Sequence, residues 1–271
     1  MPIIRVNDCE LYYEVSGHGS ETIVFSHSLL FNGAMFKAQV AALNDRYRVI
    51  IYDHRGQGRS TIPERGYDMD TLSTDAEKLI EALAPGRVHF VGLSMGGFVG
   101  LRLAARRPDL IQSLTLINTS AQHESHKLKY MLMSTWIALF GIKRLLYYIN
   151  KIVFSESFLQ DEARKTERSY WLHSLSQLPK HISRACKGVI HRQGMENELS
   201  AIRCPTLILS GSQDQAIPAT AATFLKDNID RALWRVIPNA GHSAVIEKPA
   251  LCTEAIDSFL TSQTVPHAIE A

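Results

Sequence analysis

The stretch Gly92-Leu93-Ser94-Met95-Gly96 decides the fold, because it joins two elements of different type. The residues that lead into it, Val88–Gly92 (VHFVG), are typical of a short buried strand, and Met95–Arg107 is typical of a helix. The glycines on either side of Ser94 allow the chain to fold back sharply, which lifts the serine hydroxyl clear of the sheet edge. The stretch therefore predicts a serine nucleophile on a strand-to-helix turn.

Short β-rich runs alternate with helical patterns around this turn, which predicts an α/β fold with a mostly parallel central sheet flanked by helices. Residues 121–200 break the alternation, because they read as helices without a convincing strand. We expect a core domain of residues 1–120 and 201–271, and a helical cap of residues 121–200 inserted after the sixth strand. The expected strands are Ile3–Asn7, Leu11–Val15, Thr22–Ser26, Tyr47–Tyr52, Val88–Gly92, Ser113–Asn118, Pro205–Ser210 and Leu233–Ile237. Later helices are expected near Thr220–Asn228 and Pro249–Leu260, followed by a frayed tail, Ser262–Ala271.

The composition is that of an ordinary globular protein, with 45% hydrophobic residues, 21% charged residues and a net charge of +2. So small a charge gives no reason to expect a nucleic-acid partner. No signal peptide and no run of about 18 apolar residues is visible, so we expect a cytoplasmic protein without a membrane span. The four cysteines form no C-x-x-C pair, which favours buried reduced thiols. We expect no metal and no cofactor.

A serine nucleophile needs a base, and one of the eleven histidines has a suitable setting. His242 lies in Asn239-Ala240-Gly241-His242-Ser243, between a predicted strand and the last helix. Asp214 follows the strand Pro205–Ser210 and is the candidate carboxylate behind the histidine, whereas the preceding strand ends in Asn118, which cannot serve as an acid. The chain order Ser…Asp…His predicts a catalytic triad of Ser94, Asp214 and His242.

Five segments carry a resemblance to the α/β-hydrolase superfamily, and in particular to carboxylesterases, arylesterases and 3-oxoadipate enol-lactonases. They are Ser26–Leu29 (SHSL), Asp53–Ser60 (DHRGQGRS), Gly92–Gly97, residues 211–214 (GSQD) and residues 239–242 (NAGH). The resemblance covers roughly residues 3–120 and 200–260. Epoxide hydrolases and haloalkane dehalogenases share the scaffold but carry aspartate where this chain has Ser94, which excludes both.

The resemblance also implies where a tetrahedral oxyanion would be held. In the family one backbone N–H comes from the residue after the nucleophile, here Met95, and another from the loop after the third strand, here Leu29. Each such donor contributes about 10²–10³ in rate. Ser28 resembles the enol-lactonase branch, and its hydroxyl is a candidate substrate contact. We interpret His27 and the Asp53–Ser60 loop as structural.

The expected cap contains 12 Lys and Arg residues against 7 Asp and Glu residues. We interpret this charge as a solvated surface, with attraction of an anionic substrate as the alternative. Most aromatic residues of the cap are expected in its core, while Trp136 and Phe140 are candidates for lining an apolar acyl pocket. A third interpretation docks the amphipathic stretch Met131–Phe154 on a membrane surface.

These observations predict a serine hydrolase that cleaves a small to medium, fairly apolar carboxylic ester through an acyl-enzyme on Ser94. The alternatives are a lactone hydrolase similar to 3-oxoadipate enol-lactonases and a carbon–carbon bond hydrolase. A small-molecule receptor with slow turnover is the alternative from another class, because fold does not determine function. Acyl transfer to an acceptor other than water and assembly as a homodimer both stay open.

Overall fold

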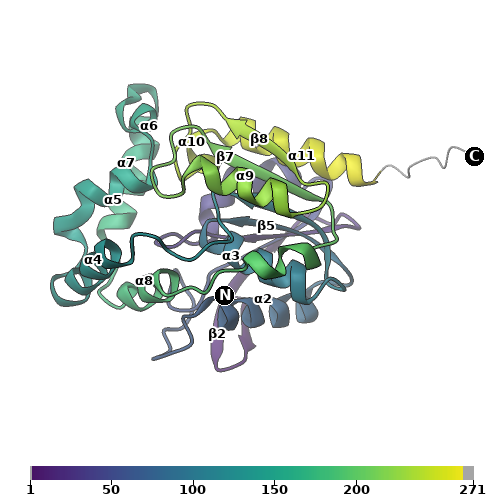
Figure 1. Cartoon of the computed structure of the whole chain (residues 1–271), viewed down its shortest axis with the longest axis horizontal. Coiled ribbons are helices and arrows are strands. Elements are labelled where there is room, and N and C mark those ends of the chain that lie inside the picture. The colour runs from purple at the N-terminus through teal and green to yellow at the C-terminus, as the bar shows by residue number, and fades with distance from the viewer. Residues whose placement is uncertain (1, 265–271) are drawn as a thin grey trace, which may run out of the picture.

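Five neighbouring strands consist almost wholly of buried residues, the pattern of parallel strands that are covered on both faces. The computed structural model describes residues 2–264 and joins these strands into an eight-stranded sheet of order β1-β2-β4-β3-β5-β6-β7-β8 (Figure 1). Strand β2 pairs antiparallel with β1 and β4, and all other pairs are parallel. The mostly parallel α/β sheet is thus confirmed. The strands are β1 Ile3–Val6, β2 Cys9–Ser16, β3 Thr22–Ser26, β4 Arg48–Tyr52, β5 Val88–Leu93, β6 Ile111–Ile117, β7 Thr206–Gly211 and β8 Leu233–Ile237.

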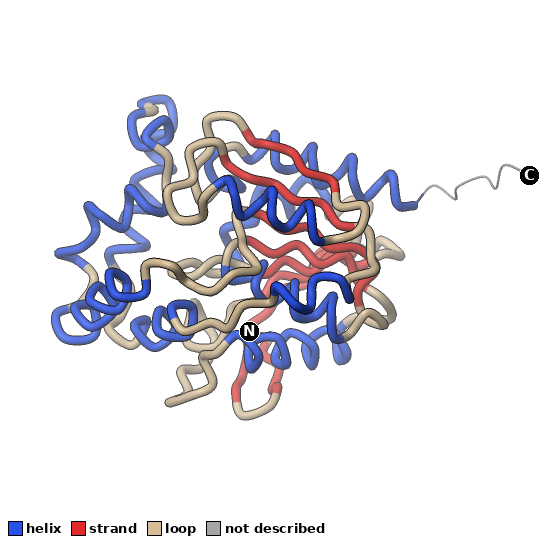
Figure 2. The backbone as a smooth tube through the Cα atoms, viewed as in Figure 1, coloured by secondary structure: helices blue, strands red, loops and turns tan. Residues whose placement is uncertain are grey.

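Helices cover both faces of the sheet, as Figure 2 shows. On one face of the sheet, strand side chains form an apolar cluster with α1 (Lys37–Leu43) and α11 (Pro249–Thr264). A second cluster, on the opposite face, contains α2 (Met69–Leu83), α3 (Met95–Arg106) and α9 (Ala219–Asn228). Alternate residues of β3 belong to the two clusters, Ile23 and Phe25 to the first and Val24 to the second, which fixes the register of the strand.

Residues 121–192 form a group of helices at one end of the sheet, on the left of Figure 1, whereas residues 195–200, expected in the same segment, pack against α3 and α9 of the core. This segment, called the cap below, leaves the core after β6 and returns before β7. Buried side chains such as Phe154, Phe158 and Trp171 join it to the first apolar cluster. Its helices are α4 Lys127–Phe140, α5 Leu146–Val153, α6 Glu156–Gln160, α7 Lys165–Ser176 and α8 Ile182–Ile190, with 3-10 turns at Lys143–Leu145 and Glu162–Arg164. A third 3-10 turn, Glu196–Ala201, packs on the core. The remaining short elements are a 3-10 turn, Gly33–Phe36, and α10, Ala244–Glu247.

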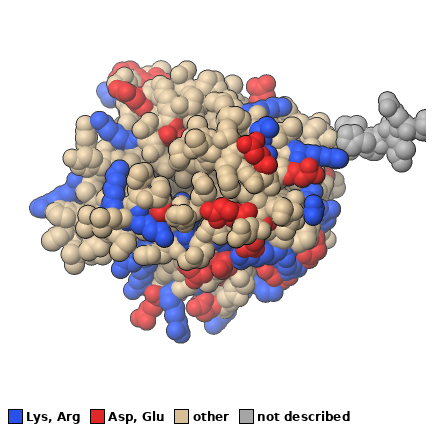
Figure 3. All heavy atoms as spheres, viewed as in Figure 1, with Lys and Arg blue, Asp and Glu red and all other residues tan. Residues whose placement is uncertain are grey.

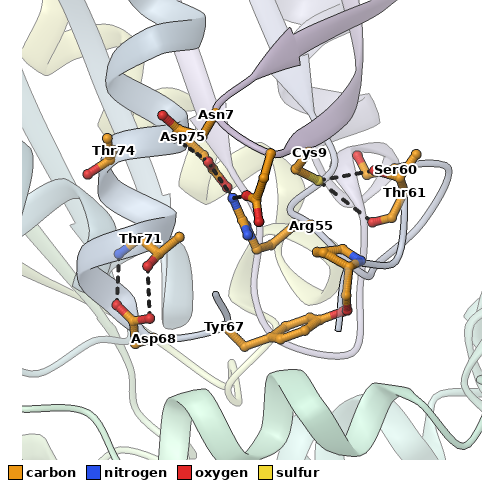
Figure 4. A network of polar contacts seen from close by, with 12 residues as sticks. Asn7, Cys9, Arg55, Ser60, Thr61, Tyr67, Asp68, Thr71, Thr74 and Asp75 are labelled. Carbon is orange, nitrogen blue, oxygen red and sulfur yellow. Dashed lines mark hydrogen bonds and ion pairs between the residues drawn. The ribbon is translucent and has the colours of Figure 1, made fainter. Parts of the chain in front are cut away.

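The loop that follows β4 is anchored by a buried ion pair, shown in Figure 4. The Arg55 guanidinium donates from Nε and Nη2 to both carboxylate oxygens of Asp75 on α2, at 2.6 and 2.7 Å. Asn7 and Asp8, in the turn between β1 and β2, also bind this pair, at 2.7 and 3.0 Å. The network ties three parts of the core to one buried cation, which gives Arg55 a structural role, as interpreted from the sequence.

The last helix runs further than the sequence suggested. It continues past Leu260 to Thr264, so Ser262 and Gln263, expected in the frayed tail, are helical. The rest of the expected tail, residues 265–271, lies outside the described residues. Within residues 2–264 no helix has the length and apolar character needed to span a membrane.

Candidate active site

Ser94 lies between β5 and α3 in a strained backbone conformation, with φ 53° and ψ −109°. Its N–H donates to the carbonyl of Ile117 (2.9 Å), and its carbonyl accepts from the Thr119 hydroxyl (2.8 Å), so β6 and the following loop hold the turn. At Gly96 a Cβ would lie 2.0 Å from the carbonyl oxygen of Ser26, which explains the glycine. Such maintained strain is typical of functional sites.

His242 lies in the loop between β8 and α10, and its ring is oriented by Asp214, which follows β7. The Nδ1 atom of His242 lies 2.9 and 3.1 Å from the two carboxylate oxygens. Asp214 also accepts from the N–H groups of Ala216 (2.7 Å) and Ile217 (3.1 Å). Because a carboxylate only accepts, the proton of a neutral His242 belongs on Nδ1, which leaves Nε2 as the basic atom.

Asn118 holds the histidine loop, a role that sequence reasoning missed. Its Nδ2 donates to the carbonyls of Gly241 (2.9 Å) and His242 (2.8 Å), and its Oδ1 accepts from the N–H of Gly211 (2.7 Å). The residue is buried and has φ 46°, a conformation that asparagine tolerates better than most residues. The side chain at the end of β6 thus joins the loops that carry Asp214 and His242.

Glu247 joins the histidine loop to the cap, and this too was not predicted. Its carboxylate accepts from the N–H groups of Gly241 (2.9 Å) and of Ser155 in the cap (3.1 Å). The N–H of Ser243 donates to the Val153 carbonyl, also in the cap (3.0 Å). Burial raises the pKa of Glu247. The position of the cap and that of the histidine loop are therefore coupled by direct hydrogen bonds.

Leu29, in the loop after β3, lines the same cavity as Ser94. His27 Nε2 accepts from the N–H of His54 (2.9 Å), so its protonated Nδ1 donates to the carbonyl of Ser28 (2.7 Å). In a trans peptide the carbonyl and the following N–H point in opposite directions, so this bond turns the Leu29 N–H away from His27. Within residues 2–264 that N–H has no acceptor.

Gln57 connects this loop to the residue after the nucleophile. Its Oε1 accepts from the N–H of Leu30 (3.0 Å), a residue in the left-handed region with φ 72°. Its Nε2 lies 3.7 Å from the Sδ atom of Met95. Met95 is the first residue of α3, where backbone N–H groups have no partner within the helix. Among the described residues, 2–264, the backbone N–H of Met95 has no acceptor either, so both residues that the family resemblance implied are available as donors.

Ser94 and His242 line the same cavity, which has a volume of about 140 Å³ between the core and the cap. Ser28 also lines it. Most of the wall is apolar, with contributions from Leu29, Met133, Ile137, Ile149, Ile152 and Val189. Cys186 lies in the wall too, but burial raises the pKa of its thiol to about 12, which keeps it protonated.

One ion pair interrupts the apolar wall. Arg192 donates from Nη1 to Glu124 (3.0 Å), and the two side chains are only 5% and 12% exposed. The guanidinium also stacks over the ring of Phe98, at 4.4 Å from its centroid. The charge of Arg192 is therefore already matched within the protein.

Trp136 and Phe140 do not line the cavity, contrary to their candidate role. Their ring centroids lie 4.7 Å apart on the outer face of α4, where Trp136 is 38% and Phe140 59% exposed. Apolar residues occur all around this helix, so its sequence could not show which face turns inward. The inner face instead contributes Tyr130, Met133 and Ile137.

Comparisons with known proteins agree with the fold. A family model described as alpha/beta hydrolase fold matches residues 21–249. A "Putative carbamate hydrolase RutD" from Caulobacter sp. strain K31 is 27% identical over 262 residues, covering 93% of this chain and 96% of the relative.

Two solved structures are also similar. The enol-lactonase from Burkholderia xenovorans LB400 has a TM-score of 0.88 at 28% identity and covers 96% of this chain and 100% of its own. A thermophilic esterase from Thermogutta terrifontis has a TM-score of 0.89 at 26% identity, covering 98% and 100%. The family model spans strands β3 to β8 and the loops that carry Ser94, Asp214 and His242, and the chain belongs to the α/β-hydrolase family.

Proposed function

We propose that this protein hydrolyses a carboxylic ester through an acyl-enzyme on Ser94. The observation that carries the proposal is the placement of Ser94 in one apolar cavity with His242, whose ring Asp214 holds with Nε2 as the basic atom. A hydroxyl, a base and an orienting carboxylate are the groups that nucleophilic acyl transfer requires.

In the first step His242 Nε2 removes the Ser94 proton while the serine oxygen attacks the ester carbonyl. The resulting oxyanion accepts hydrogen bonds from the N–H groups of Leu29 and Met95. His242 then gives the proton to the leaving alcohol, and Asp214 stabilises the imidazolium that exists between these two transfers. A water molecule next attacks the acyl-enzyme by the same sequence, which releases the acid and restores Ser94. Losing either N–H donor costs about 3–4 kcal/mol of transition-state stabilisation.

The cavity wall favours an uncharged, mostly apolar acyl group. Aliphatic side chains bind such a chain by removing its surface from water. Arg192 does not select a substrate carboxylate, because Glu124 already neutralises it and would be displaced or left unpaired. We therefore propose short to medium aliphatic esters as the preferred class.

Lactone hydrolysis is the second candidate, since the same machinery opens a cyclic ester. It is favoured by the similarity to the enol-lactonase of Burkholderia xenovorans and by Ser28, which lines the cavity next to Leu29. The serine hydroxyl supplies a hydrogen-bonding group for a second oxygen of a lactone substrate.

Hydrolysis of p-nitrophenyl esters from acetate to decanoate, by the wild type and by Ser94→Ala, tests the proposal. We expect kcat/KM to peak at one chain length and to be lost in Ser94→Ala, with the variant unfolding in urea as the wild type does. Lactones of matched size, in the same assay series, distinguish the two candidates. Activity retained by Ser94→Ala would contradict the acyl-enzyme, and slow turnover of every ester and lactone would contradict both hydrolytic functions.

A further inference from the structure

The outer face of α4 is an exposed apolar stripe. Six large apolar residues of this helix are between 38% and 73% exposed: Leu128, Met131, Leu132, Trp136, Leu139 and Phe140. Successive residues of the set are one, three or four positions apart, which places them along one side of the helix. We call these six residues the cap stripe. So much contiguous apolar surface marks an interaction site on a folded protein.

The charged residues of α4 and of the segment that follows it, through α5, all have one sign. Between residues 127 and 155 the sequence contains five basic residues and no Asp or Glu. All five are exposed: Lys127, Lys129, Lys143, Arg144 and Lys151. Other cationic residues of the cap, such as Arg168 and Arg192, have carboxylate partners. The left end of Figure 3, over the cap, shows blue side chains among tan ones.

An apolar face with aromatic residues and a basic border fits one kind of partner. A lipid surface with anionic headgroups accepts apolar side chains to the depth of its acyl boundary and attracts the flanking Lys and Arg residues. We propose that the cap stripe docks this protein on an anionic lipid surface, with α4 lying in the plane of the interface. The five basic residues contact the headgroups.

Docking would bring the catalytic cavity beside the lipid. The inner face of the same helix contributes Tyr130, Met133 and Ile137 to the cavity that contains Ser94. The binding itself does not depend on Ser94, so it stands or fails separately from the proposed hydrolysis.

Co-sedimentation of the full chain with vesicles tests the proposal. We expect binding to vesicles of phosphatidylcholine mixed with phosphatidylglycerol, and little binding to phosphatidylcholine alone. Leu132→Gln combined with Leu139→Gln, which preserves helix propensity, should weaken binding about tenfold. Lys143→Gln combined with Arg144→Gln should weaken it about fivefold for each charge removed.

Matched controls separate the cap stripe from general stickiness. Leu233→Gln with Leu251→Gln removes two exposed leucines from the core, and Arg203→Gln with Lys226→Gln removes two exposed charges there. Both controls should bind as the wild type does, and all four double variants should hydrolyse a soluble ester normally. Failure to bind anionic vesicles, or equal binding by Leu132→Gln/Leu139→Gln, would overturn the proposal. So would a dimer in sedimentation velocity that this variant abolishes, because the cap stripe would then be a subunit interface.

Discussion

Replacing Asn118 with aspartate changes one atom and reverses the hydrogen-bonding of the histidine loop. The wild-type Nδ2 donates to the carbonyls of Gly241 and His242, at 2.9 and 2.8 Å. In Asn118→Asp an acceptor oxygen would face those two carbonyl oxygens at the same distances. Ionised, the buried carboxylate would be repelled by both and could keep only its bond from the N–H of Gly211.

The expected loss of folding free energy in Asn118→Asp follows from the buried charge that is left without a partner. An uncompensated buried charge costs about 3–5 kcal/mol in folding free energy. If the loop instead moves to relieve the repulsion, His242 shifts relative to Ser94, and a displacement of about 1 Å lowers the rate roughly 10²-fold. Asn118→Ala is the matched control. It leaves the same two carbonyls unpaired without adding repulsion, and it also removes the acceptor for the N–H of Gly211. One more unpaired group costs about 1–3 kcal/mol, which is less than the buried charge adds in Asn118→Asp.

Urea unfolding and kcat/KM with a p-nitrophenyl ester, measured for both variants and the wild type, check this reasoning. We expect Asn118→Asp to be the more impaired variant in stability, activity or both. Wild-type stability and activity in Asn118→Asp would refute the assigned role of Asn118, and equal impairment of the two variants would refute the repulsion.

Three further changes have defined outcomes. Gln57→Leu removes the acceptor for the N–H of Leu30, next to Leu29, and should lower kcat about tenfold with little change in KM. Gln57→Glu keeps an acceptor and should have a smaller effect on kcat. An effect on KM alone would contradict this prediction. Glu124→Gln leaves Arg192 without a carboxylate partner, so kcat/KM for an ester with a terminal carboxylate should rise about tenfold relative to kcat/KM for its neutral analogue. If the ratio of these two kcat/KM values does not change, Arg192 does not contact the substrate. Burial lowers the pKa of His27 and of His54 below the ordinary 6.5, so the unfolded chain binds more protons and the free energy of unfolding should fall as pH drops through that value. In His54→Gln this pH dependence should be smaller, and an identical slope in urea titrations would contradict the assignment.

The fold could be predicted from the sequence because its signals are local. The buried strands show themselves as apolar runs, and the turn at Ser94 needs its glycines within two residues of the serine. The proximity of Asp214 to His242 was predictable as well, since parallel strands bring the residues after them to one edge of the sheet. Their distance in sequence does not matter once the strand order is known.

What the sequence could not supply depends on contacts between distant segments. Asn118 bonds to Gly241 and His242, more than 120 residues away, and nothing in its own neighbourhood marks that role. Trp136 and Phe140 were placed in the cavity by residue type alone, but α4 is apolar on both faces and its packing on α8 decides which one turns inward. Periodicity does not resolve such a helix.

Trapping the acyl-enzyme tests the central claim most directly. The wild type would be mixed with p-nitrophenyl butyrate, quenched in acid during turnover, digested and analysed by mass spectrometry, with Ser94→Ala and Asp214→Asn treated in parallel. We predict a butyryl group on the peptide that contains Ser94 in the wild type, less of it in Asp214→Asn, and none in Ser94→Ala. Turnover without any acylated peptide, or a butyryl group on another residue that forms at the rate of turnover, would contradict the claim that Ser94 is the nucleophile.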